Sequence, residues 1–150
     1  MRENTKGDLF ALAFDLSRWA ATWKPSIVGQ PVRLGYKFFV CWLLGIDVPD
    51  TTHIGKNFRV YHGVGLVIHK DTVIGDCVTV RHNTTIGNAR KGGGAPVIGD
   101  HVDIGANSVI IGEISIGDHS IIAAGSVVIR NVPANVIVAG NPAKVVKALV

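Results

Sequence analysis

The stretch from Ile98 to Val128, IGDHVDIGANSVIIGEISIGDHSIIAAGSVV, carries an aliphatic residue at every sixth position. A six-residue period matches neither the 3.6-residue turn of an α-helix nor the two-residue alternation of a hairpin meander. It is typical of a parallel β-helix, in which each hexad forms one short strand and one corner, and three hexads complete a coil. The aliphatic side chains then point inward, and stacked coils bury one continuous core. The repeated residues are Ile98, Ile104, Ile110, Ile116, Ile122 and Val128.

The same period continues towards the N-terminus, first in phase and then two residues out of phase. The in-phase residues are Ile74, Val80 and Ile86, and the out-of-phase residues are Ile54, Val60 and Leu66. We therefore predict a two-residue insertion near VIHK, residues 67–70. A second, usually small or β-branched, residue follows four positions after each aliphatic one. These residues are Val78, Thr84, Val102, Ser108, Ile114, Ser120, Ser126 and Val132.

The N-terminal and C-terminal segments of the chain lack the repeat. Residues 1–45 carry apolar residues at helical spacing in two segments, so we predict two helices separated by a proline-bounded turn at KPSIVGQP, residues 24–31. These helices are expected to cap the open end of the coil. From about residue 133 we predict a tail with a short strand and a helical end. The predicted fold is mainly β, with a β-helix domain over residues 46–150 and a helical segment over residues 1–45.

Composition excludes several classes of protein. The chain has 150 residues with 47% hydrophobic and 17% charged residues, which is enough for one domain with a core and too apolar for disorder. The longest apolar run, residues 38–46, is half of the roughly 20 residues a spanning helix needs, and it suits a buried or surface-docked helix. The N-terminus lacks a signal-peptide pattern. Cys41 and Cys77 show no metal or redox spacing, so we expect free thiols in the cytoplasm.

The net charge of +4 comes from scattered basic residues rather than a basic run interleaved with aromatics. Nucleic-acid binding is therefore not expected. Scattered cations suit a polyanionic small molecule such as a nucleotide-bearing cofactor.

Residues 18 apart in a three-sided coil stack at the strand spacing of about 4.8 Å, so columns of side chains can be read from the numbering. His62 precedes His82 by one coil plus the two-residue insertion, and we predict that these histidines are neighbours on one edge. Two further columns are predicted. They are Asn88–Ala106–Ala124, whose small side chains would leave a smooth groove, and His82–Asp100–Asp118.

His62 lies in the strand-like segment RVYHGVGLVIHK, residues 59–70. Its side chain could hydrogen-bond to backbone at a corner, hold a metal or move a proton. A metal site needs three convergent ligands, and the neighbouring TVRHNTTIGN supplies His82 alone, so no metal is expected. The segment GNARKGGGAPV, residues 87–97, is predicted to be a protruding loop with a binding role, the alternative being a tolerated insertion.

Several segments resemble the hexapeptide-repeat acyltransferases over residues 45 to 145. They are GIDV, IGKNFRVYHGVGLVI, VTVRHNTTIGN, VDIGANSVIIGEISIGDHSIIAAGSVV and VPANVIVAGNPAKVV. The sequence is most similar to the serine acetyltransferase branch and, within it, to acetyltransferases of exopolysaccharide (colanic acid) synthesis. The resemblance implies a left-handed β-helix, a homotrimer with active sites between subunits, and acetyl-CoA as the acyl donor.

The resemblance also implies roles for residues. His62 matches the catalytic histidine of the family, and Asp47, 15 residues earlier, matches the aspartate that orients it. The residues expected to bind CoA are Asn88, Ala106, Ala124, Arg130 and Lys144. The residues expected to bind the acceptor are Tyr61, His82, Arg90 and Lys91.

Two departures from the serine acetyltransferases bear on the acceptor. Those enzymes resemble one another in an aspartate directly before the catalytic histidine and in an arginine-histidine pair before the loop proline. Here the corresponding residues are Tyr61, Gly94 and Ala95, so groups that hold the charged ends of an amino acid are missing. We therefore expect an O-acetyltransferase acting on a sugar hydroxyl of a nucleotide- or lipid-linked glycan. A serine O-acetyltransferase and a non-catalytic or metal-binding β-helix are the alternatives.

The expected location is the cytoplasm or the inner face of the membrane. The apolar helix near Phe38 could make a peripheral contact with the membrane surface, but we expect it to form a buried cap.

Overall fold

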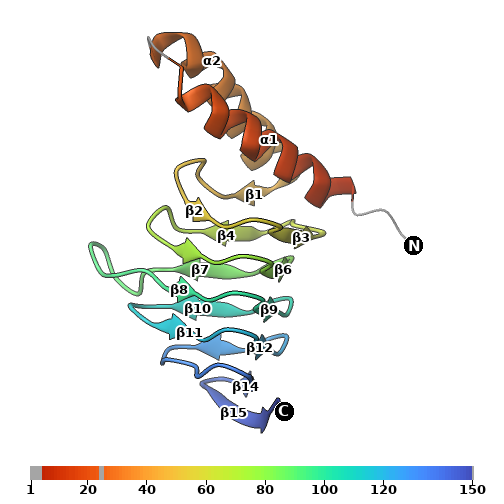
Figure 1. Ribbon diagram of the computed structural model, residues 1–150, viewed down its shortest axis with the longest axis vertical. Helices are drawn as coiled ribbons and strands as arrows, with labels where there is room; N and C mark the ends of the chain where they lie inside the picture. The colour runs from red at the N-terminus through yellow and green to blue at the C-terminus, as the bar shows by residue number, and fades with distance from the viewer. Residues whose placement is uncertain (1–4, 24–25, 150) are drawn as a thin grey trace.

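The computed structural model describes residues 5–23 and 26–149. Figure 1 shows a three-sided prism of short strands, with helices lying across the end of the prism that precedes the first coil. The helices are α1 (Thr5–Ala21), α2 (Ser26–Lys37) and the π-helix η1 (Phe38–Leu44). None of the helices in these described ranges is long and apolar enough to cross a bilayer.

The strands form three sheets, one for each side of the prism. Sheet 1 contains β1 (Ile46–Asp47), β4 (Leu66–Ile68), β7 (Thr85–Gly87), β10 (Val109–Ile111) and β13 (Val127–Val128). Sheet 2 contains β2 (His53–Ile54), β5 (Val73–Ile74), β8 (Val97–Ile98) and β11 (Ser115–Ile116). Sheet 3 contains β3 (Arg59–Tyr61), β6 (Thr79–Arg81), β9 (Asp103–Ile104), β12 (Ile121–Ile122), β14 (Val136–Gly140) and β15 (Ala143–Ala148). Through most of the prism a strand pairs in parallel with the strand three places on, as β4 does with β7, which confirms the predicted β-helix.

The core of the prism consists of the residues that the six-residue period identified. Their side chains are buried, and Ile86, Ile98, Ile104, Ile110 and Ile122 have at most 1% of their surface exposed. The second inward position is filled by small residues because the prism narrows at its corners. Buried serines there satisfy their hydroxyls on backbone carbonyls, as Ser108 Oγ does by donating to Gly105 O at 2.8 Å.

The register between coils corrects the predicted columns. Ile86 pairs with Ile110 rather than Ile104, because residues 88–96 leave the prism as a loop and add six residues outside the coil. Asn88 therefore does not stack on Ala106 and Ala124, and His82 does not stack on Asp100 and Asp118. Figure 1 shows the loop projecting between β7 and β8. The aspartates form a different ladder, in which Asp118 accepts from the Asp100 N–H and Asp100 accepts from the Asp76 N–H, both at 2.8 Å.

The two-residue insertion is also placed differently from the prediction. Tyr61 pairs with Arg81, and Val67 pairs with Thr85, so the extra residues lie between Tyr61 and Leu66. They enlarge the corner that carries His62, whereas the prediction placed them near residues 67–70.

The ends of the chain differ in part from the predictions. The second helix begins at Ser26 and includes Pro31, so the predicted turn is wrong for residues 26–31, and residues 24–25 lie outside the described residues. The tail forms an antiparallel hairpin of β14 and β15, so its predicted helical end is wrong. Backbone pairing with β14 explains this, because it overrides the local helical pattern of AKVVKAL.

The helices form the expected cap. Phe10 and Phe14 of α1 are buried against the first coil, and the Tyr36 hydroxyl donates to Val48 O at 2.6 Å. Burial raises the pKa of Tyr36. The segment near Phe38 is buried only on one side, through Val40 and Leu44.

Candidate active site

One edge of the prism, between sheets 3 and 1, brings four of the expected site residues into a column. The register of sheet 3 places His62 beside His82, His82 beside Ala106, and Ala106 beside Ala124. The rings of His62 and His82 lie with their centroids 6.0 Å apart at an interplanar angle of 72°, so the predicted histidine pair is confirmed. We call this column the His62 edge. Below the histidines the column continues with two small side chains, those of the half-buried Ala106 and the exposed Ala124.

The corner that carries His62 holds the side chain outward. His62 has a φ of 67°, its carbonyl accepts from the Val64 N–H at 2.7 Å, and the Gly63 carbonyl accepts from the Leu66 N–H at 2.9 Å. This turn requires glycine at position 63, because a Cβ there would lie 2.5 Å from Ile46 Cδ1. The imidazole is exposed and makes no hydrogen bond with any described residue. The backbone-bonded interpretation of the His62 side chain is therefore not supported.

His82 supplies a second feature of this edge. Its Nδ1 atom is buried and lacks a hydrogen-bond partner among the described residues. A buried polar atom without a partner calls for an explanation, and a bound molecule beside His62 would provide one.

Tyr61, Arg81 and Asp103 form a cluster on sheet 3 beside the His62 edge. Arg81 pairs with Asp103, and its Nη1 also donates to Ile104 O at 3.2 Å. The hydrogen bond to Asp103 raises the pKa of Arg81. The Arg81 guanidinium carbon lies 6.0 Å from the centre of the Tyr61 ring, which supports the half-exposed ring from one side. Sequence reasoning did not identify Arg81, although it follows Tyr61 by the 20 residues that separate His62 from His82.

Asp47 lies on the outward side of β1 in sheet 1. The Gly65 N–H donates to Gly45 O at 2.8 Å, which ties the His62 corner to the chain two residues before Asp47. The Asp47 carboxylate contacts Cys41 Sγ at 3.8 Å, and burial raises the pKa of that thiol. No hydrogen bond joins Asp47 to His62 among the described residues. The orienting role of Asp47 stays a prediction.

The remaining expected residues lie at other parts of the prism. Asn88 lies at the edge between sheets 1 and 2, where it lines a pocket of about 440 Å³ together with Asp47. Arg130 lies at the same edge, two residues after β13, and we call this the Asn88 edge. Arg90 and Lys91 are exposed on the loop that leaves it, whereas Lys144 is exposed on β15. The expected CoA-binding residues therefore lie in three places: the His62 edge, the Asn88 edge and the final hairpin.

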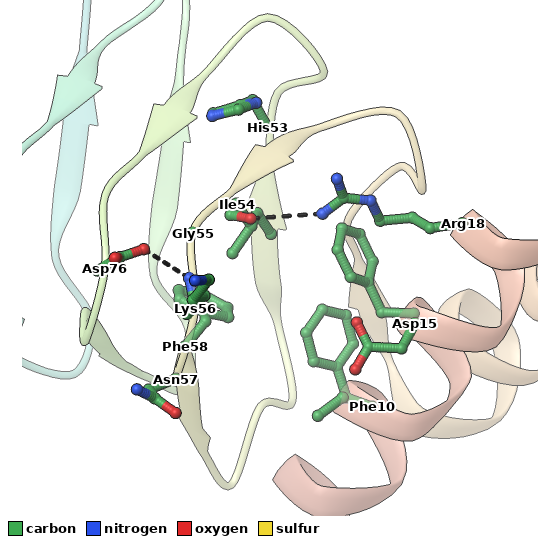
Figure 2. A pocket seen from close by; sticks show the side chains of 12 residues that line it. Phe10, Asp15, Arg18, His53, Ile54, Gly55, Lys56, Asn57, Phe58 and Asp76 are labelled. Atoms are coloured by element: carbon green, nitrogen blue, oxygen red, sulfur yellow. Dashed lines mark hydrogen bonds between the residues drawn. The ribbon is translucent and has the colours of Figure 1, made fainter.

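A pocket of about 680 Å³ lies elsewhere, between α1 and the first coil (Figure 2). Phe10 and Phe58 line it, Arg18 donates to Ile54 O at 3.4 Å, and the Lys56 N–H donates to Asp76 at 2.7 Å. The Arg18 hydrogen bond and the contact of Phe10 with Phe58 join the cap to the first coil, whereas the Lys56–Asp76 hydrogen bond joins the first coil to the second. None of the site residues expected from the sequence lines this pocket. Within the described ranges, no three histidine, cysteine or carboxylate side chains converge as metal ligands would.

Comparison with known proteins identifies the family. The model of the bacterial transferase hexapeptide family (six repeats) matches residues 95–130. The WcaB protein of Escherichia coli strain K12, assigned as a colanic acid biosynthesis acetyltransferase, is 36% identical over 140 residues, which cover 89% of this chain and 86% of WcaB. Serine acetyltransferase 4 of Arabidopsis thaliana is 43% identical over 106 residues, which cover 69% of this chain and 30% of that protein.

Solved structures agree with this assignment. Serine acetyltransferase from Neisseria gonorrhoeae superposes with a TM-score of 0.82 at 31% identity, covering 97% of this chain and 55% of that one. The Brucella abortus enzyme in complex with coenzyme A superposes with a TM-score of 0.83 at 31% identity, covering 97% of this chain and 57% of that one. The chain therefore spans about half the length of these serine acetyltransferases. By its repeat, its fold and its likeness to WcaB over most of both chains, the protein belongs to the hexapeptide-repeat acetyltransferases.

Proposed function

We propose that the protein is an acetyl-CoA-dependent O-acetyltransferase that acetylates a sugar hydroxyl during the synthesis of a surface polysaccharide. The observation that carries this proposal is the His62 edge, where an unpaired, outward imidazole stands beside His82 at the head of a column of small residues. The likeness to WcaB supports the class of acceptor.

The chemistry at His62 is a direct transfer. The neutral imidazole accepts the proton of the acceptor hydroxyl while its oxygen attacks the thioester carbonyl. The tetrahedral intermediate then collapses, the carbon–sulfur bond breaks, and the CoA sulfur takes a proton from the imidazolium. Asp47 is assigned the role of stabilising that imidazolium, and backbone N–H groups near Gly87 and Asn88 the role of binding the oxyanion. An acyl-enzyme is not needed, because binding both substrates side by side lowers the entropic barrier.

The donor is assigned to the His62 edge. Ala106 and Ala124 allow a thin chain such as the pantetheine arm to lie close to the backbone. Arg130 and Lys144, which are exposed, are assigned to the CoA phosphates, and Asn88 to the arm. The complex of coenzyme A with the Brucella abortus serine acetyltransferase supports the choice of donor.

The division of these residues between two edges supports a trimeric enzyme. One edge carries His62, while Asn88 and Arg130 lie at the opposite border of sheet 1. A closed threefold assembly would bring the Asn88 edge of one subunit to the His62 edge of the next. We infer a homotrimer with its active sites between subunits, each site taking the loop residues Arg90 and Lys91 from the neighbouring chain.

The acceptor is inferred from the Tyr61 cluster. A tyrosine ring supported by Arg81 offers a flat apolar surface with a hydroxyl at its edge, which suits the face of a sugar ring. It does not suit the ammonium group of serine, which would need a carboxylate in this position. Serine remains the second candidate because several relatives are named serine acetyltransferases.

Release of CoA thiol from acetyl-CoA tests the proposal, with L-serine and a panel of nucleotide sugars and glycan fragments as acceptors. Release with a sugar and not with serine is the expected result. Release with serine alone would overturn the argument from Tyr61. If no acceptor gives release and acetyl-CoA does not bind, the protein is a non-catalytic β-helix.

A further inference from the structure

Two adjoining pockets form one groove on the cap side of the Asn88 edge. The first is the pocket of about 440 Å³ that Asn88 lines, and the second, of about 500 Å³, lies between α2 and the segment that follows β1. Asp47, Pro49 and Thr51 line both pockets, so the two are continuous. We call this continuous depression the cap groove. It runs from Asn88 on the second coil to Gln30 on α2.

The wall of the groove nearest the cap is fixed by contacts within the chain. Arg33 of α2 pairs with Asp50 at 2.7 Å, and the buried Tyr36 hydroxyl donates to Val48 O at 2.6 Å. All four residues line the pocket of about 500 Å³. The groove is therefore formed before a ligand binds, which lowers the entropy that binding must lose.

The groove also carries polar side chains that the protein itself does not use. Five of its side chains make no hydrogen bond or ion pair with any described residue. They are Gln30, Lys37, Thr51, Lys70 and Asn88. The amide and hydroxyl groups both donate and accept hydrogen bonds, and the ammonium groups donate. A ligand can therefore find hydrogen-bond partners along the whole length of the groove, from α2 to the second coil.

The charges in the groove are separated and nearly balanced. Arg33 and Asp50 neutralise each other. Asp47 lines both pockets, whereas Lys37 lines one and Lys70 lines the other. A polyphosphate needs several cations at one place, and a hydrocarbon would cover these polar groups without pairing them. A chain that carries many hydroxyl groups suits this lining, so the groove favours a glycan.

The cap groove and the column of the His62 edge extend in opposite directions along the prism. The column starts at His62 in the first coil and passes through His82, Ala106 and Ala124, away from the cap. A donor bound along this column leaves the cap side of His62 open. A threefold axis parallel to the prism keeps each coil at its own height, so it would bring the cap groove of one subunit to the level of His62 in the next.

We propose that the acceptor is an oligosaccharide of at least two sugar units. The ring to be acetylated lies at Tyr61 and His62 of one subunit, and the adjoining rings lie in the cap groove of the neighbouring subunit. This inference rests on the proposed function and its trimer, and it narrows the acceptor from a sugar hydroxyl to an extended chain. A single sugar occupies only the part of the site beside His62.

The dependence of the rate on acceptor length tests this inference. The probes are the active sugar of the acceptor panel as its methyl glycoside, and the di- and trisaccharides that carry this sugar at either end. We expect kcat/KM for CoA release to be higher by about tenfold or more with the trisaccharide than with the methyl glycoside, because remote rings add binding energy. In Gln30→Ala/Lys37→Ala, and in Thr51→Trp at the junction of the two pockets, this ratio should fall to about threefold or less.

The matched control is Lys6→Ala/Lys56→Ala, which removes two exposed side chains of the cap and the first coil outside the groove, and it should keep the wild-type ratio. Circular dichroism checks the fold of each variant. Equal kcat/KM for the methyl glycoside and the trisaccharide in the wild type would overturn this inference and leave the proposed function standing. A wild-type ratio in both groove variants would also overturn it. No release with any sugar would contradict the proposed function itself, and this inference with it.

Discussion

Gly63 directly follows His62 and has no space for a side chain. Its φ is 59°, and a Cβ would lie 2.5 Å from Ile46 Cδ1. Both the backbone conformation and the close approach to Ile46 therefore require glycine at this position. The outward position of His62 depends on this neighbour, because the same turn sets the direction of both residues.

We expect Gly63→Ala to lower the free energy of unfolding by about 2–4 kcal/mol, because it combines a left-handed backbone with overpacking. The control is Gly125→Ala, at a φ of 72° with nothing within 4 Å of the added Cβ, which should cost about 1–2 kcal/mol. Urea unfolding measures both. Replacing Ile46 by Val in the Gly63→Ala background removes Cδ1 and should recover part of the loss. Equal effects of the two alanine variants would contradict the contact with Ile46.

At the scale of elements, the cap is fastened to the coil through Asp50. Its carboxylate accepts from Arg33 Nε of α2 and from Ser17 Oγ of α1, both at 2.7 Å. The hydrogen bond from Arg33 is the main reason that the pKa of Asp50 is lowered. A single side chain after β1 thus joins both α-helices to the first coil.

We expect Asp50→Asn to lower the free energy of unfolding at pH 7 by roughly 1–3 kcal/mol, because it removes the charge from hydrogen bonds of a largely buried group. A lowered folded pKa means that this stability is present above the ordinary carboxyl pKa of about 4 and is lost as the pH falls through the folded value. The difference between wild type and variant should therefore shrink below pH 4. Asp8→Asn, an exposed aspartate of α1, is the control and should change stability little at any pH. A pH-independent difference for Asp50→Asn would contradict the ion pair.

The strands could be predicted from the sequence because the interior of the prism accepts one aliphatic side chain per hexad. Ile98, Ile104 and Ile110 repeat for that physical reason, and all are buried. The stacking of columns could not be predicted from the period, because the loop at residues 88–96 adds one hexad without changing the phase. The three glycines of this loop indicated that residues leave the coil. If six residues had been subtracted from the sequence separation between coils, His82 would have been placed beside Ala106.

The site was predictable only in part. His62 and His82 were paired correctly because no loop intervenes between their coils. The Tyr61–Arg81 contact was missed, although the same register gives it. The exposure of Trp42 and Phe38 could not be predicted, because apolar residues at helical spacing give the same sequence pattern whether their side chains are covered by protein or left exposed.

At the scale of the whole molecule, the proposed trimer predicts that inactive variants can complement each other. Active sites formed within single subunits would not show this. If each site takes His62 from one subunit and Asn88 from the next, two inactive variants should restore activity when mixed. We expect His62→Ala and Asn88→Trp to be inactive alone. Unfolded and refolded together in equal amounts, random threefold assembly leaves one intact site in each mixed trimer, or about a quarter of wild-type activity. Initial rates of CoA release measure this, and no recovery would place both residues in the same site of one subunit.

The central claim is that His62 is the base that accepts the hydroxyl proton, and its replacement tests this most directly. With the acceptor found in the panel, we expect CoA release by His62→Ala to fall by about 10²–10⁴-fold while acetyl-CoA binding is retained. The matched control is His119→Ala, which removes an exposed histidine with a φ of 58° from another edge, and it should keep the wild-type rate within about twofold. Wild-type turnover by His62→Ala would contradict the account.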